Sequence, residues 1–254
     1  MVIREDIDLP VKLGTDLILS AVFELRFSVK VPSEAVFGIF YPVVVKKYPH
    51  VKLVRLPITH LPEEIRQSDP NLKYQPYYRL DIGTQGINIG STTIQFFVQK
   101  PYIGWEQWQT FIIELLPQFI CTGSFEKIER TGLRFINFTE QNLYSITNTE
   151  IKVGNRNCTC QPMTFRTEIT EIKEKQYTTI LQLVSDAIIE TFPSNRLSGS
   201  VIDIEVIRNI NSSVNDFQNE IDVLLNESHK IAKNLFFEIL QPDFLKTLKP
   251  TYKE

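Results

Sequence analysis

The alternation of apolar and polar residues is clearest between residues 87 and 138, where it predicts a strand, a helix and another strand. In residues 87–99 apolar side chains recur at every second position, which is typical of a strand with one face toward solvent. In residues 105–121 the apolar spacing becomes three or four, which is typical of a helix with one buried side. Residues 125–138 return to the strand pattern, and Gly132 within them predicts a β-bulge. We therefore expect a helix packed on a sheet.

The same patterns extend the prediction toward both ends of the chain. Residues 17–29 alternate strictly and predict a strand near the N-terminus. Residues 163–172 and 176–185 flank a charged turn and predict a hairpin, and residues 200–207 predict a third strand beside it. A broad apolar stripe over residues 214–240 predicts the long helix that covers these strands.

Capping signals predict where three helices begin. Ser33 and Ser213 are candidate N-caps, and Pro242 stands where a first helical residue needs no N–H group. Residues 57–76 are rich in proline, acidic and amide residues, and we interpret them as an exposed excursion.

Together these elements predict the α+β class, with antiparallel sheets each backed by an amphipathic helix. Residues 1–138 and 139–254 both end as strands covered by one helix. Two alternatives follow: two similar sheet-and-helix halves, which would fit a diverged duplication, or one compact unit.

Composition excludes some classes of function. The chain has 254 residues, 43% hydrophobic and 22% charged, as expected of a globular protein. A net charge of -3 argues against strong binding to nucleic acid or anionic membranes. No run approaches the ~18 apolar residues of a membrane span, and acidic residues near the N-terminus argue against a signal peptide. With three cysteines, which fit reduced thiols, these features predict a cytoplasmic protein.

Four segments together resemble a sporadically distributed family of prokaryotic proteins of uncharacterised function. They are Ala21-Val22-Phe23-Glu24-Leu25-Arg26-Phe27, Tyr102-Ile103-Gly104-Trp105-Glu106, Gly132-Leu133-Arg134-Phe135-Ile136-Asn137, and His229 with Phe236-Phe237 and Pro242-Asp243-Phe244-Leu245. The resemblance spans nearly the whole chain. It implies no activity and no cofactor, and its patchy distribution implies genes carried on mobile or defence-related islands.

Catalytic and metal-binding motifs are missing from the sequence. It contains no phosphate-binding glycine loop, His-Glu-x-x-His motif, nucleophile elbow or paired metal-binding cysteines. Cys158 and Cys160 come nearest to a metal signal, but Cys121, His50, His60 and His229 are the only further Cys and His side chains for a zinc site. We interpret His229 as a hydrogen-bonded residue at the edge of the core. The sequence thus predicts no cofactor, no metal and no catalytic residue.

One group of polar residues is a candidate binding site. If the strand of Glu24 and Arg26 pairs with the strand of Arg134 and Asn137, these groups gather on one sheet face and Glu24 pairs with Arg134. The alternative, which we favour, is a structural cross-strand ion pair.

Three classes of function remain, in this order. The first is a non-enzymatic module that binds another protein through the excursion and the adjacent Tyr74 and Tyr77. The second is a small-molecule binder or enzyme with a pocket between sheet and helix, anchored by Arg26 or Arg134. The last is nucleic-acid binding through four basic residues, Lys46, Lys47, Lys52 and Arg55. Nothing in the sequence predicts an oligomeric state.

Overall fold

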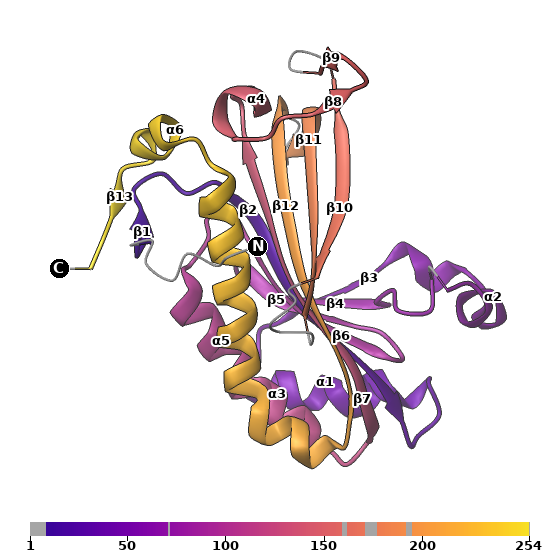
Figure 1. Ribbon diagram of the computed structural model, residues 1–254. Coiled ribbons are helices and arrows are strands. Elements are labelled where there is room, and N and C mark those ends of the chain that lie inside the picture. The colour runs from indigo at the N-terminus through magenta and orange to yellow at the C-terminus, as the bar shows by residue number, and fades with distance from the viewer. Residues whose placement is uncertain (1–8, 71, 159–161, 171–176, 192–194, 254) are drawn as a thin grey trace.

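A single nine-stranded antiparallel sheet organises the molecule (Figure 1). The structure is a computed structural model that describes residues 9–70, 72–158, 162–170, 177–191 and 195–253. The predicted α+β class is confirmed, and strands from both halves of the chain join in this one sheet. None of the described helices is long and apolar enough to cross a membrane.

Every neighbouring pair of strands in the large sheet runs antiparallel. In order across the sheet, the strands are β10 (Thr164–Thr170), β11 (Tyr177–Thr191), β12 (Asn195–Ser212), β7 (Phe125–Thr139), β2 (Ile18–Val29), β6 (Thr93–Gln99), β5 (Gln85–Ile89), β4 (Tyr78–Ile82) and β3 (Lys52–Arg55). Two small pairs lie outside it, namely β1 (Lys12–Leu13) with β13 (Pro250–Thr251) and β8 (Lys152–Val153) with β9 (Arg156–Asn157).

Three long helices cover the sheet on one face (Figure 1). They are α1 (Ala35–Lys47), α3 (Trp105–Ile120) and α5 (Val214–Ile239). Four short helical segments complete the fold, namely η1 (Pro57–His60), α2 (Glu63–Ser68), α4 (Leu143–Ile146) and α6 (Pro242–Thr247). Trp108 and Ile112 of α3 are fully buried, as the predicted helical stripe requires.

The paired strands β2 and β7 lie at the centre of the sheet. Period-two alternation places Phe23 and Leu25 of β2 in the core beneath the helices, and both are fully buried. The predicted bulge in β7 is present but not at Gly132. Arg26 pairs with Arg130 and the next residue, Phe27, pairs with Ile128, so Glu129 is an extra residue; Glu126 is a second one, because Ser28 pairs with Lys127 and Val29 with Phe125.

Gly132 is not the bulge residue, and its lack of a side chain makes room for a neighbouring side chain. A Cβ atom at this position would lie 3.1 Å from Oε1 of Glu205 on the next strand. The missing side chain therefore leaves room for charged side chains of the neighbouring strands above it.

The capping predictions differ in outcome. Ser213 caps α5, because its side chain accepts a hydrogen bond from the N–H of Asp216. Ser33 does not cap α1, whose N-cap is Glu34 without a side-chain cap. Ser33 instead donates its hydroxyl proton to Glu63 of α2 at 2.5 Å, and so attaches the excursion to the helix layer.

The C-terminal part of α5 departs from the predicted stripe. Leu224 and Leu225 are buried in the core, whereas Phe236 and Phe237 are only partly buried. These two rings line a cleft between the helices and the sheet. The partly exposed aromatic rings at this end of the helix therefore mark the place to look for a binding site.

Candidate functional site

A cleft of about 750 Å³ lies between the helix layer and the sheet, on the face where the core is. Its walls are the first turn of α3, the C-terminal half of α5, the N-terminal segment around β1, and sheet residues of β2, β7 and β12. This volume falls within the roughly 300–1,000 Å³ typical of small-molecule sites. The apolar part of the wall comprises chiefly Trp105, Phe135, Ile204, Ala232, Phe236 and Phe237.

Trp105 and His229 form a stacked pair in the wall of this cleft. Their ring centroids are 4.1 Å apart and their planes differ by 4°. Phe135 of β7 lies beside both rings, with centroids 6.4 Å from Trp105 and 5.9 Å from His229. The stack joins the start of α3 to the middle of α5 and forms a flat surface between them.

His229 is neutral at pH 7. Burial lowers the pKa of its imidazole from 6.5 to about 4, with a smaller contribution from the nearby Lys233 ammonium. Its burial agrees with the predicted position of His229 at the edge of the core, but its ring makes no hydrogen bond among the described residues, in contrast to our interpretation. Its ring still forms part of the cleft wall, which the sequence did not predict.

Tyr102 lines the cleft, and its hydroxyl oxygen is buried within the wall. This oxygen has no hydrogen-bond partner among the described residues. Burial, and to a lesser degree the negative charge of Asp16, raise the pKa of Tyr102, so the phenol remains a hydrogen-bond donor. A buried donor without a partner carries a free-energy cost of about 1–3 kcal/mol.

Asp16 and Asn137 are two further polar residues of this wall, which also includes Lys12, Glu106, Gln107 and Lys233. The Asp16 carboxylate accepts the N–H of Ile18 at 2.9 Å, and burial raises its pKa. Asn137 is buried and donates from Nδ2 to the carbonyl of Ile202 at 3.2 Å. These hydrogen bonds fix both side chains, so the cleft combines apolar walls with few oriented polar groups.

The predicted group of four polar residues is divided between the two faces of the sheet. Glu24, Arg26 and Arg134 lie on the face away from the helices, whereas Asn137 lines the cleft. The pairing of β2 with β7 is as predicted. However, Asn137 stands an odd number of residues from Arg134, and period-two alternation therefore places it on the opposite face.

The predicted pair of Glu24 with Arg134 is wrong. Arg134 donates two hydrogen bonds to Asp203 of β12, at 2.9 Å from Nε and 2.5 Å from Nη2. Glu24 instead pairs with Arg26 at 2.6 Å and accepts an amide hydrogen bond from Gln95 at 3.0 Å. The sequence could not distinguish these partners, because the position of β12 beside β7 was unknown.

Arg130 completes a charged network on this outer face. Its guanidinium group lies 3.8 Å from Glu24 and 2.6 Å from Glu205, directly over Gly132. These side chains form ion pairs across three adjacent strands, while Nε of Arg130 is buried without a hydrogen-bond partner among the described residues. The arrangement therefore supports the structural alternative that we favoured for these charges.

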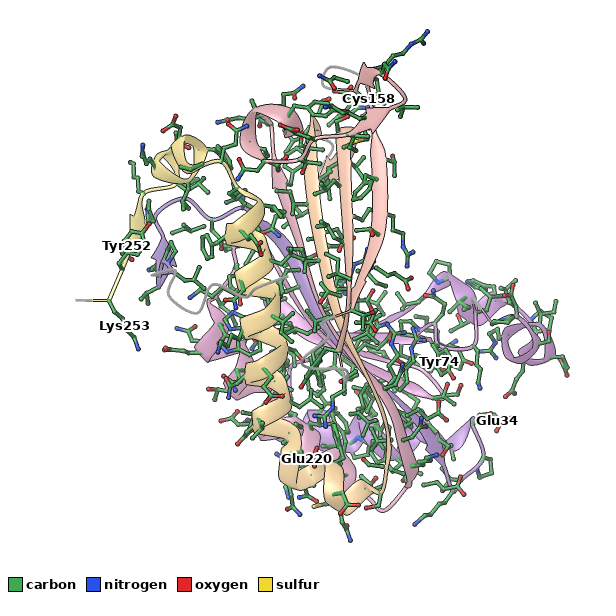
Figure 2. All side chains as sticks on the ribbon, viewed as in Figure 1. Glu34, Tyr74, Cys158, Glu220, Tyr252 and Lys253 are labelled. Carbon is green, nitrogen blue, oxygen red and sulfur yellow. The ribbon has the colours of Figure 1, made fainter. Side chains whose placement is uncertain are left out.

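The excursion (residues 57–76) is folded in part. Figure 1 shows α2 projecting away from the sheet. Tyr74 returns to the outer sheet face (Figure 2), where Arg26 lies 4.2 Å from its ring and its hydroxyl donates to Glu129 at 3.2 Å. Tyr77 shares a hydrogen bond with Ser91 at 3.1 Å. Both tyrosines thus attach the excursion to the sheet.

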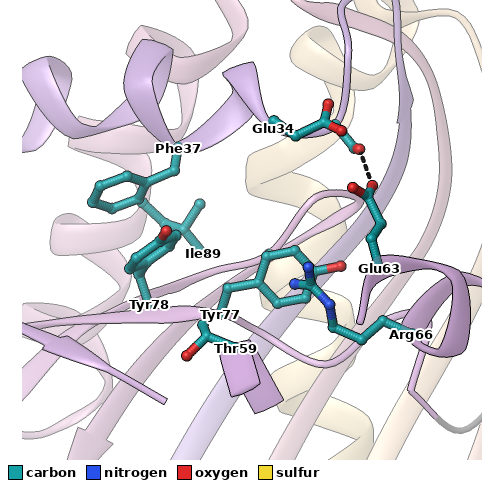
Figure 3. A pocket seen from close by; sticks show the side chains of 10 residues that line it. Glu34, Phe37, Thr59, Glu63, Arg66, Tyr77, Tyr78 and Ile89 are labelled. Carbon is teal, nitrogen blue, oxygen red and sulfur yellow. Dashed lines mark hydrogen bonds between the residues drawn. The ribbon is translucent and has the colours of Figure 1, made fainter. Parts of the chain in front are cut away.

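A second, smaller pocket of about 170 Å³ lies where the excursion meets α1 (Figure 3). Arg66 of α2 stacks over Tyr77, with 4.2 Å between guanidinium carbon and ring centroid. Phe37 stacks on Tyr78 at 3.9 Å on the other side of the pocket. These contacts occupy the aromatic faces, so this pocket has less capacity for a ligand than the cleft.

The cysteines do not form a metal site in the described part of the chain. Cys158 follows β9 at the far end of the molecule (Figure 2), and Cys160 lies outside the described residues, as does the predicted hairpin turn at 173–175. Among the described residues, no group of three or more His, Cys, Asp or Glu side chains could hold a metal ion.

Three of the four segments behind the family resemblance meet at the cleft. The cleft is lined by residues 102–106, by Phe135 and Asn137, and by His229, Phe236 and Phe237, and the rings of Trp105 and His229 stack in one shared wall. We compared the chain with family models and with curated proteins, and none of them matches it. The resemblance therefore stays a prediction, but its segments come together in space.

Sequence reasoning offered a pocket between sheet and helix as its second class of function, but it anchored that pocket on Arg26 or Arg134 and did not identify the residues that line the cleft. Trp105 and His229 were assigned to apolar helix faces, and the polar groups Asp16, Tyr102 and Lys233 were not considered. The available signal was the cluster 102–106 just before a helix, where an aromatic and a phenol flank a glycine. Helical periodicity accounts for Trp105 equally well, so this signal was ambiguous.

The depressed pKa of His229 predicts a pH dependence of stability. The imidazole takes up a proton near pH 6.5 in the unfolded chain but only near pH 4 in the folded protein. The contribution of neutral His229 to the free energy of unfolding should therefore be fully present above pH 6.5. It should decrease as the pH falls from 6.5 to 4. His229→Phe keeps a ring against Trp105 and should remove much of this fall, measured by urea unfolding at pH 7 and pH 5.

His50→Asn provides the matched control, because His50 is exposed. This variant should retain the pH dependence of the wild type. If His229→Phe and the wild type lost equal stability between pH 7 and pH 5, the neutral, buried state of His229 would be contradicted.

Proposed function

We propose that this protein is a binding protein that holds a small organic ligand in the cleft between α3, α5 and the sheet. The observation that carries the proposal is the cleft itself, about 750 Å³ in volume and lined by aromatic rings from two helices and a strand. This is the second of the classes considered from sequence. The predicted anchors Arg26 and Arg134 are replaced by cleft residues, since both arginines lie on the other face.

The walls of the cleft suit recognition of a partly apolar molecule. Aromatic side chains from two helices and a strand supply apolar area, whose burial provides most of the binding free energy at about 25 cal/mol per Å². The stacked pair of Trp105 and His229 fixes one wall before binding, which limits the entropy cost.

Catalysis is not needed to account for this site, and we retain the hypothesis that the protein acts by binding. The imidazole of His229 is stacked face to face on Trp105 and desolvated. Such an arrangement favours a role for the ring as a contact surface. An accessory role in a mobile or defence-related system rests on the family resemblance alone.

A neutral fluorescent probe tests the cleft directly. N-phenyl-1-naphthylamine should bind at one saturable site with increased emission. Phe236→Ala removes an aromatic ring from the wall and should weaken binding about tenfold, or ~1.4 kcal/mol. Phe165→Ala removes an equally half-buried ring from β10, outside the cleft, and should leave the dissociation constant within about twofold.

Circular dichroism spectra and melting curves would first establish that both variants are folded. The proposal fails if the probe shows no saturable binding to the wild type, or if the two phenylalanine variants weaken it equally.

A second candidate function is recognition of another protein through the excursion. The observation that favours it is the exposure of two large apolar side chains beside α2, Leu61 at 39% and Ile65 at 49%. They project from a segment that is fixed at its base by Ser33, Arg26 and Tyr74. Exposed apolar side chains on an anchored loop are common at protein–protein interfaces.

Two double variants with matched chemistry test this second function. Leu61→Ser with Ile65→Ser should abolish capture of specific proteins from the native host. Val153→Ser with Ile188→Ser, at other exposed positions, should not change it. Both should melt near the wild-type temperature, because exposed side chains contribute little to the core. Identical sets of captured proteins, compared by mass spectrometry, would contradict a role for the excursion.

A further inference from the structure

Lys233 places a positive charge in the wall of the cleft, which bears on the charge of a ligand there. Lys233 of α5 lines the cleft one helical turn beyond His229. Among the described residues it makes no ion pair with a carboxylate. Burial, and the positive charge of nearby Lys253, lower the pKa of its ammonium group. A half-buried cation beside a second cation lacks the counter-charge that its surroundings would favour.

The first turn of α3 adds backbone N–H donors to the same cleft, beside the Glu106 carboxylate. Gly104, the N-cap, has a φ of 91° and provides no side-chain cap, and the next three residues also line the cleft. The N–H groups at the start of a helix lack intrahelical acceptors, and the helix dipole adds partial positive charge there. These N–H groups can serve as donors for an anionic ligand group.

Two carboxylates also line the cleft. Asp16 accepts the Ile18 N–H and lies in the field of Lys100, and Glu106 lies in the first turn of α3. Two positively charged residues, Lys12 and Lys233, also line the cleft, and Lys253 lies near Lys233. Asp16 is therefore partly balanced by its own neighbours, whereas Lys233 is not.

We infer that the ligand of this cleft is an organic anion, with an apolar body against the aromatic walls and its negative group near Lys233. This inference rests on the proposed function and adds the charge of the ligand to it. Lys233 attracts the anionic group, and the aromatic rings of Trp105, Phe236 and Phe237 contact the body. A carboxylate or sulfonate on an aromatic or aliphatic framework has the required chemistry.

Three probes with one apolar body and different charge test the inference. The anion 1-naphthaleneacetate, the neutral 1-naphthaleneacetamide and the cation 1-naphthylmethylamine would be titrated into the full-length protein by calorimetry. The acetate should bind at least tenfold more tightly than the amide, and the amine more weakly than both. Lys233→Met should lower the affinity for the acetate about tenfold and leave the amide unchanged.

Lys230→Met is the matched control, because Lys230 is exposed on the same helix and does not line the cleft. It should retain the preference for the anion, and added salt should reduce that preference. Equal binding of acetate and amide, tighter binding of the amine, or equal loss of acetate and amide in Lys233→Met would overturn the anion inference while leaving the cleft a binding site. If none of the probes bound and N-phenyl-1-naphthylamine also failed, the proposed function would fail with it.

Discussion

The burial of only one face of the central strands is the constraint on which the rest of the structure depends. Phe23 and Leu25 of β2 point into a core covered by α1, α3 and α5, so every alternate residue must face the other way. The charged side chains of three strands consequently gather on the outer face, where Arg130 pairs with Glu205 and Arg134 with Asp203. These charges neutralise one another. The cleft in which we propose that a ligand binds lies on the other face, beneath the helix layer.

The cleft arises because α3 and α5 do not cover the sheet to the same extent. The two helices meet at the stack of Trp105 on His229, and beyond it α5 continues without α3 beside it. Its last turns therefore present Phe236 and Phe237 to a space that the N-terminal segment and the sheet enclose. The stack of Trp105 on His229 therefore lies at the boundary of the core and forms part of the cleft wall.

Much of the fold was predictable because strand and helix periodicities are local. Alternation in β2 and the stripe of α3 required no knowledge of neighbouring strands, and the Ser213 cap depends on residues three apart. The partners of Glu24 and Arg134 were not predictable, because they depend on which strands adjoin β2 and β7. The bulge at Glu129 was misplaced to Gly132, whose missing side chain makes room for Glu205. The residues that line the cleft were not predicted, because they come from five separate segments of the chain.

The central claim is that ligand binding takes place in this cleft and not at the excursion or on the charged sheet face. The most direct measurement is a titration of 15N-labelled protein with 1-naphthaleneacetate, followed by two-dimensional NMR of the backbone amides. Binding in the cleft should shift the amide signals of residues 102–107, 135–137 and 229–237, which line it. Shifts concentrated at residues 57–78, or on the outer-face residues Arg26 and Arg134, would contradict it.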